Sequence, residues 1–349
     1  MDAEVKSQME LFTHSNSLPK IELHAHLNGS IRKTTLIELL DNDDKDKLEA
    51  LYPVMDFPNA MKFFAISSKI VTDINIVRRI TREMIEDWTK HNVIYMEIRT
   101  TIKAKQGVFS KEEYLYAVLD EINKGNMKYD TIIRLIISLD RAKDLEDYQE
   151  TFDIYKTFKD ENLKKLIVGV DYCGNEINEK HKYNDIIPIL QKFRDEGLGV
   201  TIHMGENPNY QIFPFDQFRP DRVSHAYFFK EIHYLEFMKR KIPVEVCPTL
   251  SYKITHSTSY KDIPMKNFYK QTLTDEEGNE FVYDLISINT DDTMLVLTDI
   301  SQEYFEVGSN FGISLKELKN IILRGIDFIF EKDETIRGKL REKINNYPC

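Results

Sequence analysis

The strongest constraint on the fold is an alternation of short apolar runs and helical patterns along the whole chain. Eight runs are rich in Val, Ile and Leu, and each is followed by polar residues or a turn, as expected of β-strands. Several are nearly continuous in branched residues, which is typical of parallel strands buried on both faces. The predicted strands are 21–27, 94–101, 132–140, 166–174, 199–206, 222–228, 243–249 and 285–292. This pattern predicts an α/β fold, a (β/α)8 TIM barrel.

Helical patterns fill the intervals between the predicted strands. Apolar residues recur every four positions from Ile76 to Trp88 and predict one buried helix stripe. Two intervals are longer than the simple repeat requires. Segment 28–93 predicts a helical insertion after the first strand, and segment 250–284 contains a turn signal at 275–279.

The composition restricts the class of function. A net charge of −11 argues against a surface for nucleic acid or an anionic membrane. No apolar stretch approaches the roughly 20 residues that span a bilayer. The acidic start lacks the pattern of a secretory signal, and three cysteines are too few for a disulfide framework. We therefore expect residues 1–349 to form a single domain of a cytoplasmic, monomeric protein that acts on a small molecule.

Histidines and aspartates gather at the ends of the predicted strands. The chain has nine histidines, and two of them stand one residue apart at the end of the first strand, so their side chains share one face. In a barrel the carboxyl ends of all strands converge on the face where catalytic groups lie. The residues at such ends are His24, His26, His203, His225, Asp291 and Asp292.

Part of this set is suited to a metal ion. Three imidazoles and one carboxylate make a zinc site with a position left for water, and a bound divalent cation would lower the pKa of that water. We predict one Zn²⁺ per chain, with the ligands His24, His26, His203 and Asp291. His225 is placed to orient or deprotonate the water, and Glu206 to move a proton to or from substrate. Other readings stay open: His225 as a core histidine, Glu206 as a loop carboxylate and Asp292 as a helix N-cap.

Five motifs in this order, HAHLNGS, VGVDYCGNE, TIHMGENPN, DRVSHA and SINTDD, resemble the adenosine deaminase family. The resemblance covers about residues 18–345. Within the family the chain is most similar to the adenosine deaminase-like branch, which acts on N6-methyl-AMP and related nucleotides. The branch features are HLNGS, where nucleoside-specific members usually carry HLDGS, the PN after Glu206, SLDRA at 138–142 and ISQEY at 300–304. The resemblance implies a zinc-dependent hydrolase of purine nucleotide metabolism and salvage that converts N6-methyl-AMP to IMP and methylamine.

The resemblance also implies roles for individual residues. It assigns the four predicted ligands to the metal, Glu206 to proton donation to the purine ring and His225 to the attacking water. Asp292 matches the residue that binds a ring nitrogen, and the backbone of Gly174 matches a contact to the base. The remaining substrate-side positions are His26, Asn28, Thr100, Thr101, Lys103 and Asp140.

The chain departs from the family pattern at several places. The Gly-His-Gly of the family is Ser-His-Ala at 224–226, which adds two side chains near the expected substrate. The branch usually has Ser-Thr-Pro-Arg after the second strand, whereas 100–103 reads Thr-Thr-Ile-Lys, so a point-charge lysine replaces a bidentate arginine. A histidine expected in the first insertion corresponds to Ser68, and Thr293 follows the paired aspartates where the family has proline or glycine.

Three functions stay open at this point. The first is a zinc-dependent deaminase of an N6-methyl-AMP-like nucleotide, and the second is an adenosine deaminase that releases inosine and ammonia. The third is a catalytically degenerate barrel that only binds a ligand. A 5′-phosphate needs basic partners, for which Arg32, Lys33 and Lys103 are candidates. A solvated surface charge explains all three equally well, and it is the better explanation for Lys33.

Overall fold

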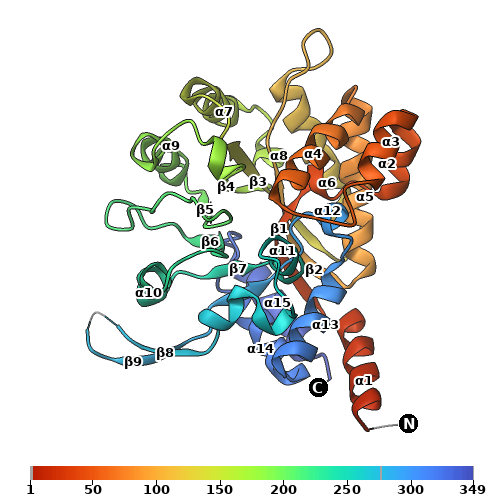
Figure 1. Cartoon of the computed structure of the whole chain (residues 1–349). Coiled ribbons are helices and arrows are strands. Elements are labelled where there is room, and N and C mark those ends of the chain that lie inside the picture. Colours follow the sequence, from red (N-terminus) through yellow and green to blue (C-terminus); the bar gives the residue numbers. More distant parts are fainter. Residues whose placement is uncertain (1–2, 276, 349) are drawn as a thin grey trace.

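A parallel eight-stranded sheet forms the centre of the protein. The computed structural model describes residues 3–275 and 277–348, and its strands follow the order β1-β2-β3-β4-β5-β6-β7-β10. Helices surround this sheet (Figure 1). The strands are β1 (Lys20–His26), β2 (Val93–Thr100), β3 (Ile132–Asp140), β4 (Ile167–Cys173), β5 (Gly199–Met204), β6 (Arg222–His225), β7 (Val244–Val246) and β10 (Ile286–Ile288). The predicted (β/α)8 barrel is confirmed.

The barrel closes through the residues that follow β10. Asp291 donates its backbone N–H to the carbonyl of His24 at 2.8 Å, and its own carbonyl accepts from the N–H of His26 at 3.2 Å. These bonds form a parallel bridge between Ala25 and Asp291. The seam between the first and last strands therefore places Asp291 directly beside the two histidines of β1.

The outer helices follow the amphipathic patterns of the sequence. The predicted stripe lies on α5 (Ile74–Lys90), where Ile80, Met84 and Trp88 are buried and Ile76 is partly exposed. The other helices of the outer layer are α6 (Lys111–Lys128), α7 (Leu145–Thr157), α8 (Glu161–Lys164), α9 (Tyr183–Asp195), α10 (Glu231–Lys239), α13 (Ile300–Phe311), α14 (Leu315–Gly325) and α15 (Glu334–Asn345). None of the helices in the described part of the chain is long and apolar enough to cross a membrane.

The first long interval is helical, as predicted. After β1 the chain forms η1 (Leu27–Gly29), α2 (Lys33–Leu39), α3 (Asn42–Glu49), α4 (Phe57–Ser67) and η2 (Ser68–Ile70) before it enters α5. The second interval contains α11 (Pro248–Ile254), η4 (Tyr260–Asp262), η5 (Pro264–Asn267) and a hairpin of β8 (Gln271–Thr274) and β9 (Glu280–Tyr283). The predicted turn joins the two strands of this hairpin, which were not themselves predicted.

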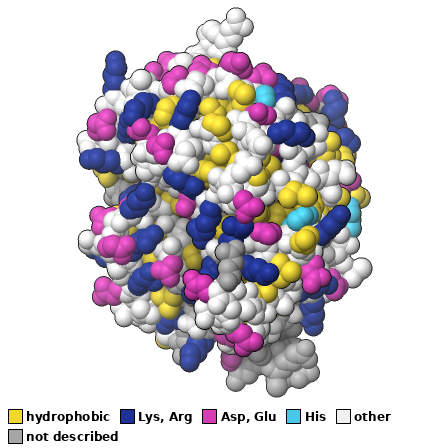
Figure 2. Space-filling view, turned by 90° about the vertical axis from the view of Figure 1, so that its left-hand side faces the viewer, with side chains coloured by type: hydrophobic (Ala, Val, Ile, Leu, Met, Phe, Trp, Pro, Cys, Tyr) yellow, Lys and Arg dark blue, Asp and Glu magenta, His cyan; other side chains and the backbone are white. Residues whose placement is uncertain are grey.

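The N-terminal helix and the C-terminal segment of the described chain lie at the same end of the molecule (Figure 1). Helix α1 (Ala3–Ser17) packs beside α13, with the rings of Phe12 and Phe305 edge to face at 5.6 Å. The hydroxyl of Tyr347 bonds both Nδ1 of His14, at 2.9 Å, and Oγ of Ser17, at 2.7 Å. On the face that Figure 2 shows, Lys and Arg side chains are interspersed with Asp and Glu.

The interior of the barrel contains ion pairs as well as aliphatic side chains. Arg222 donates a hydrogen bond to Glu97 at 2.5 Å and forms an ion pair with Glu245 at 2.6 Å, and Arg99 donates to the same Glu245. Each of these four side chains is at most 1% exposed. Buried charges persist only when they are paired and hydrogen-bonded, so this network fixes the side chains that line the barrel.

Candidate active site

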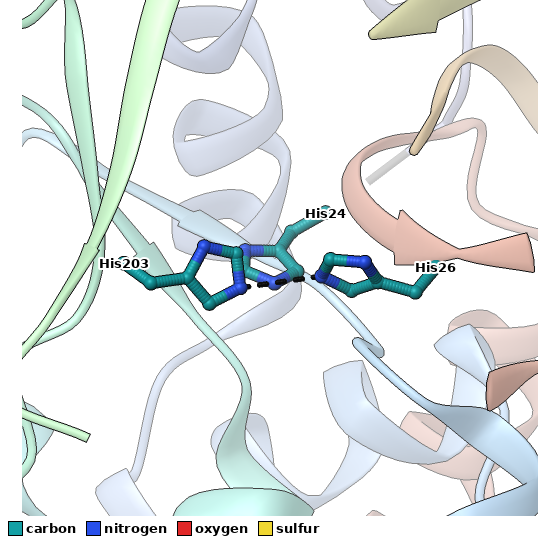
Figure 3. Close-up of side chains that lie close together, drawn as sticks. All are labelled: His24, His26 and His203. Carbon is teal, nitrogen blue, oxygen red and sulfur yellow. Dashed lines mark hydrogen bonds between the residues drawn. The ribbon is translucent and has the colours of Figure 1, made fainter. Parts of the chain in front are cut away.

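Three histidine rings converge at the carboxyl ends of β1 and β5. The Nε2 atoms of His26 and His203 lie 3.2 Å apart, and the rings of His24, His26 and His203 face one another (Figure 3). Their centroids are separated by 4.8 Å to 5.2 Å. The three predicted side chains therefore lie together. Two imidazole nitrogens at this separation can share a proton or bind the same cation.

Asp291 and His225 complete the group. Oδ1 of Asp291 lies 3.5 Å from Nε2 of His24 and 3.7 Å from Nε2 of His26, while Oδ2 lies 3.6 Å from Nε2 of His225. The Nε2 atoms of His24 and His225 are buried without a hydrogen-bond partner. Ligands bound at about 2.0–2.2 Å to one zinc lie roughly 3.3–3.6 Å apart. The donor set and its spacing therefore fit a divalent cation.

Carboxylates fix the orientation of two of these imidazoles. His24 donates Nδ1–H to Glu245 at 2.8 Å, and His203 donates Nδ1–H to Asp171 at 2.9 Å. Each bond leaves the Nε2 lone pair directed at the centre of the cluster, as in metal sites with oriented histidines. Burial alone would raise the pKa of Glu245, but Arg99 and Arg222 outweigh it and hold that pKa well below its usual range.

His225 is held in the same way by a different partner. Its Nδ1 bonds the hydroxyl of Tyr227 at 2.9 Å, and that hydroxyl donates to the carbonyl of Cys247 at 3.2 Å. The tyrosine oxygen therefore accepts from His225 and leaves Nε2 of His225 facing Asp291. A core histidine would have both nitrogens satisfied, and His225 has only one. This favours the catalytic interpretation.

Backbone conformations at the site are strained. His225, Ala226 and Asp291 have φ values of 68°, 57° and 61°, in the left-handed region that favours glycine. Such residues cost about 1–3 kcal/mol each and cluster at functional sites. The observed strands β6 and β10 end at or before these left-handed residues, and the predicted runs extended past them.

Glu206 follows β5 on a tight turn. Gly205 has φ of 63°, and a Cβ at that position would lie 2.3 Å from the ring of Phe229. Glu176, which follows β4, accepts from the backbone N–H of Gly205 and of Asn207, each at 2.9 Å. Sequence reasoning did not single out Glu176, although it stands in the VGVDYCGNE motif. Its two bonds hold the turn that presents Glu206.

The environment of Glu206 favours a protonated carboxyl. Although its side chain keeps some surface exposure, loss of hydration raises its pKa, and the neighbouring charges of Asp291 and Glu176 raise it further, so the pKa lies well above the usual value. A carboxyl that keeps its proton at neutral pH is suited to act as a general acid.

Asp292 enters the site past a glycine. A Cβ at Gly29 would lie 1.7 Å from Oδ1 of Asp292, so only glycine allows this approach. Asp292 occupies the N-cap position of α12 (Thr293–Val296), but its side chain makes no capping bond. Oδ1 of Asp292 and Oδ1 of Asn28 are both buried without partners. Buried polar atoms without partners, one next to Gly29 in the chain and one against Gly29 in the fold, indicate a place where a ligand forms hydrogen bonds.

The other substrate-side residues follow β2, β3 and β4. Gly174 has φ of 99°, and a Cβ there would lie 2.6 Å from Oδ1 of Asp140. Thr100 is buried and shares its hydroxyl with Tyr114 at 2.8 Å, whereas Thr101 is partly exposed. Burial lowers the pKa of Lys103, and the nearby charge of Asp140 opposes that shift.

The three candidate phosphate contacts differ in their surroundings. Arg32 pairs with Asp87 at 2.6 Å and with Glu86, and Lys33 pairs with Glu49 at 2.7 Å, so both are neutralised within the insertion. Among the described residues no carboxylate lies within 4.0 Å of the ammonium group of Lys103. Lys103 is therefore the candidate whose charge is available to a ligand.

Residues 19–347 match the adenosine deaminase family, and this match covers nearly the whole chain. The chain belongs to the adenosine deaminase family. The predicted family and the predicted enzyme class, a hydrolytic purine deaminase, are thus confirmed. Members of this family depend on a metal, and the chain has a donor set suited to one.

Individual relatives extend the comparison. The N6-mAMP deaminase of Arabidopsis thaliana is 31% identical over 93% of this chain and 96% of its own length. An adenosine deaminase of Clostridium botulinum is 28% identical over 91% of this chain and 95% of its own. Among solved structures, Arabidopsis ADAL complexed with IMP superposes with a TM-score of 0.82 at 30% identity, covering 95% of this chain and 97% of that one. The similarity to each of these three proteins therefore extends over nearly the whole of both chains.

Proposed function

We propose that this protein is a zinc-dependent hydrolytic deaminase of 6-substituted purine nucleotides, with N6-methyl-AMP as substrate and IMP and methylamine as products. The observation that carries the proposal is the convergence of three imidazoles and Asp291, with orphaned buried nitrogens, beside a carboxyl that favours its proton. The Arabidopsis relatives, one named N6-mAMP deaminase and one solved with IMP, support the nucleotide as the substrate class.

The residues of the site divide the chemistry between them. His24, His26, His203 and Asp291 would hold the ion, which would supply a Lewis acid that makes water more acidic. His225 orients the water through Nε2 and takes up its proton. Glu206 donates a proton to the ring nitrogen as water adds at C6. The C6–N bond then breaks, the amine leaves with the proton that His225 took from the water, and the new hydroxyl returns a proton to Glu206 as C6 becomes a carbonyl. Asp292 bonds a second ring nitrogen, and the backbone of Gly174 lies against the base.

The second candidate is deamination of adenosine, which the Clostridium relative favours. Asn28 argues for the nucleotide, because a neutral amide avoids placing a carboxylate beside a phosphate. Initial rates with adenosine, AMP and N6-methyl-AMP, followed by purine absorbance, distinguish the two candidates. We expect the highest kcat/KM for N6-methyl-AMP. A higher value for adenosine would replace the proposal with plain adenosine deamination, and no turnover of any of the three by the metal-loaded protein would leave only a binding role.

Asn28→Asp tests whether a phosphate lies near η1. Like charges about 4 Å apart cost about 1–4 kcal/mol between water-like and surface-like dielectric. We expect the variant to lower kcat/KM for AMP and N6-methyl-AMP much more than for adenosine. If kcat/KM falls equally for all three substrates, Asn28 contacts the ribose and does not lie beside a phosphate.

Lys103→Ala tests the proposed phosphate contact directly. We expect a higher KM for nucleotides, a smaller change for adenosine, and a weaker dependence of nucleotide KM on salt, because a screened charge pair is lost. Lys33→Ala is the matched control, since that lysine is paired with Glu49. Equal effects of the two substitutions would exclude Lys103 as the phosphate partner.

A further inference from the structure

We propose that Ser224 is a positioning residue for the metal site, and that it acts on His24 through Glu245. The proposal rests on the proposed function, because it takes His24 to be a metal ligand. Sequence reasoning noted Ser224 only as a side chain that replaces a glycine of the family pattern. The structure shows this side chain at 0% exposure in β6, inside the barrel and away from the solvent.

The hydroxyl of Ser224 lies between a donor and an acceptor. Arg99 directs its NH1 group at Oγ of Ser224 at 3.3 Å, and Oγ lies 2.5 Å from Oε2 of Glu245. Since Arg99 can only donate and an ionised carboxylate can only accept, the hydroxyl proton of Ser224 points to Glu245. The direction of the bond is therefore set by its neighbours.

The oxygen that Ser224 contacts is the one that orients His24. Oε2 of Glu245 accepts Nδ1–H of His24 at 2.8 Å and also accepts from Arg99. Ser224 thus fixes the rotation of this carboxylate, and with it the angle at which His24 presents Nε2 to the cluster. Without the hydroxyl, Oε2 of Glu245 keeps the hydrogen bonds from His24 and Arg99. It loses the 2.5 Å hydrogen bond from Ser224, which is shorter than the bond from His24.

The same network reaches the second oriented ligand. The NH1 group of Arg99 lies 3.4 Å from Oδ1 of Asp171, the oxygen that holds Nδ1 of His203. Arg99 therefore contacts both carboxylates that orient His24 and His203, and Ser224 bonds both Arg99 and Glu245. A side chain that only filled space at this position would need no hydroxyl, so the arrangement favours a role in positioning.

The test is the affinity of the whole protein for zinc, measured by competition with a chelator. Removing partners of metal-bound histidines typically weakens metal binding about 10–100-fold. We expect Ser224→Ala and Ser224→Gly each to weaken zinc binding about 10-fold or more, with little change in the melting temperature of the metal-free protein. Ser251→Ala is the matched control, because the hydroxyl of Ser251 is buried and has no partner. Unchanged affinity in both Ser224 variants, or an equal loss in the control, would overturn the proposal.

A second readout separates positioning from a general loss of stability. Cobalt bound in place of zinc has a visible spectrum that depends on ligand geometry, and we expect it to change in Ser224→Gly but not in Ser251→Ala. An unchanged cobalt spectrum in Ser224→Gly would count against positioning. Because both measurements need no substrate, a wild-type protein that binds zinc but deaminates no purine would refute the proposed function and leave this inference standing. Full deaminase activity with equal zinc affinity in the Ser224 variants would refute only the inference.

Discussion

Replacing His203 with alanine should remove most of the bound metal. His203 supplies one of four donors, and its Nε2 lies 3.2 Å from that of His26, so its loss opens the centre of the cluster. Loss of a residue that only hydrogen-bonds to a metal ligand weakens metal binding by up to about 100-fold. Because His203 is itself a proposed ligand, we expect the affinity for zinc to fall by more than that. Elemental analysis of the purified variant measures the effect.

The matched control for this prediction is His233→Ala. His233 lies on α10 and bonds the hydroxyl of Tyr210 at 2.6 Å, outside the metal cluster. This variant should keep a full complement of metal. Full occupancy in His203→Ala would instead show that His203 is not a ligand, and the assignment of the remaining three residues would then need revision.

Replacing Glu206 with glutamine should leave metal binding intact and reduce turnover by about 10²-fold or more, as expected for the loss of a general acid. Glutamine keeps the size of the side chain and the turn held by Glu176, but it has no acidic proton. The comparison of kcat, zinc content and melting temperature between wild type and variant isolates the chemical step.

Glu146→Gln, an exposed change on α7, serves as the control for Glu206→Gln. It should behave as wild type in all three measurements. Near-normal turnover of Glu206→Gln with metal bound would remove this carboxyl from the mechanism and would require another donor for the ring proton.

Much of the fold could be predicted because burial imposes a clear pattern on parallel strands. All eight predicted runs overlap a strand of the barrel, and the insertion after β1 is helical. The ends of β6 and β10 were placed too late, because β6 ends at His225 and β10 ends before Asp291, where the backbone adopts left-handed conformations that the residue pattern does not show. The hairpin of β8 and β9 was missed because each strand has only four residues, with short alternation that also suits a loop.

The convergence of the histidines and Asp291 could be predicted because these residues stand at the ends of predicted strands. The residues that orient these histidines could not be predicted from the sequence. Asp171, Glu245 and Arg99 also lie within apolar strands, but their function depends on which strands face each other across the barrel. A one-dimensional pattern does not contain that pairing, and the same limit applies to Glu176, whose two backbone bonds appear only in the folded chain.

The closure of the barrel through Asp291 has a thermodynamic consequence. The backbone of this residue joins the last strand to the first, and its carboxylate faces His24 across the same seam. A metal held by both residues, as we propose, would be a reversible cross-link between distant parts of the chain, and it would form only when the barrel is closed. Binding that is restricted to the closed state stabilises that state by RT ln(1 + [metal]/Kd). The availability of metal therefore sets how often the seam opens, and amide hydrogen exchange at His26 and Asp291 reports it.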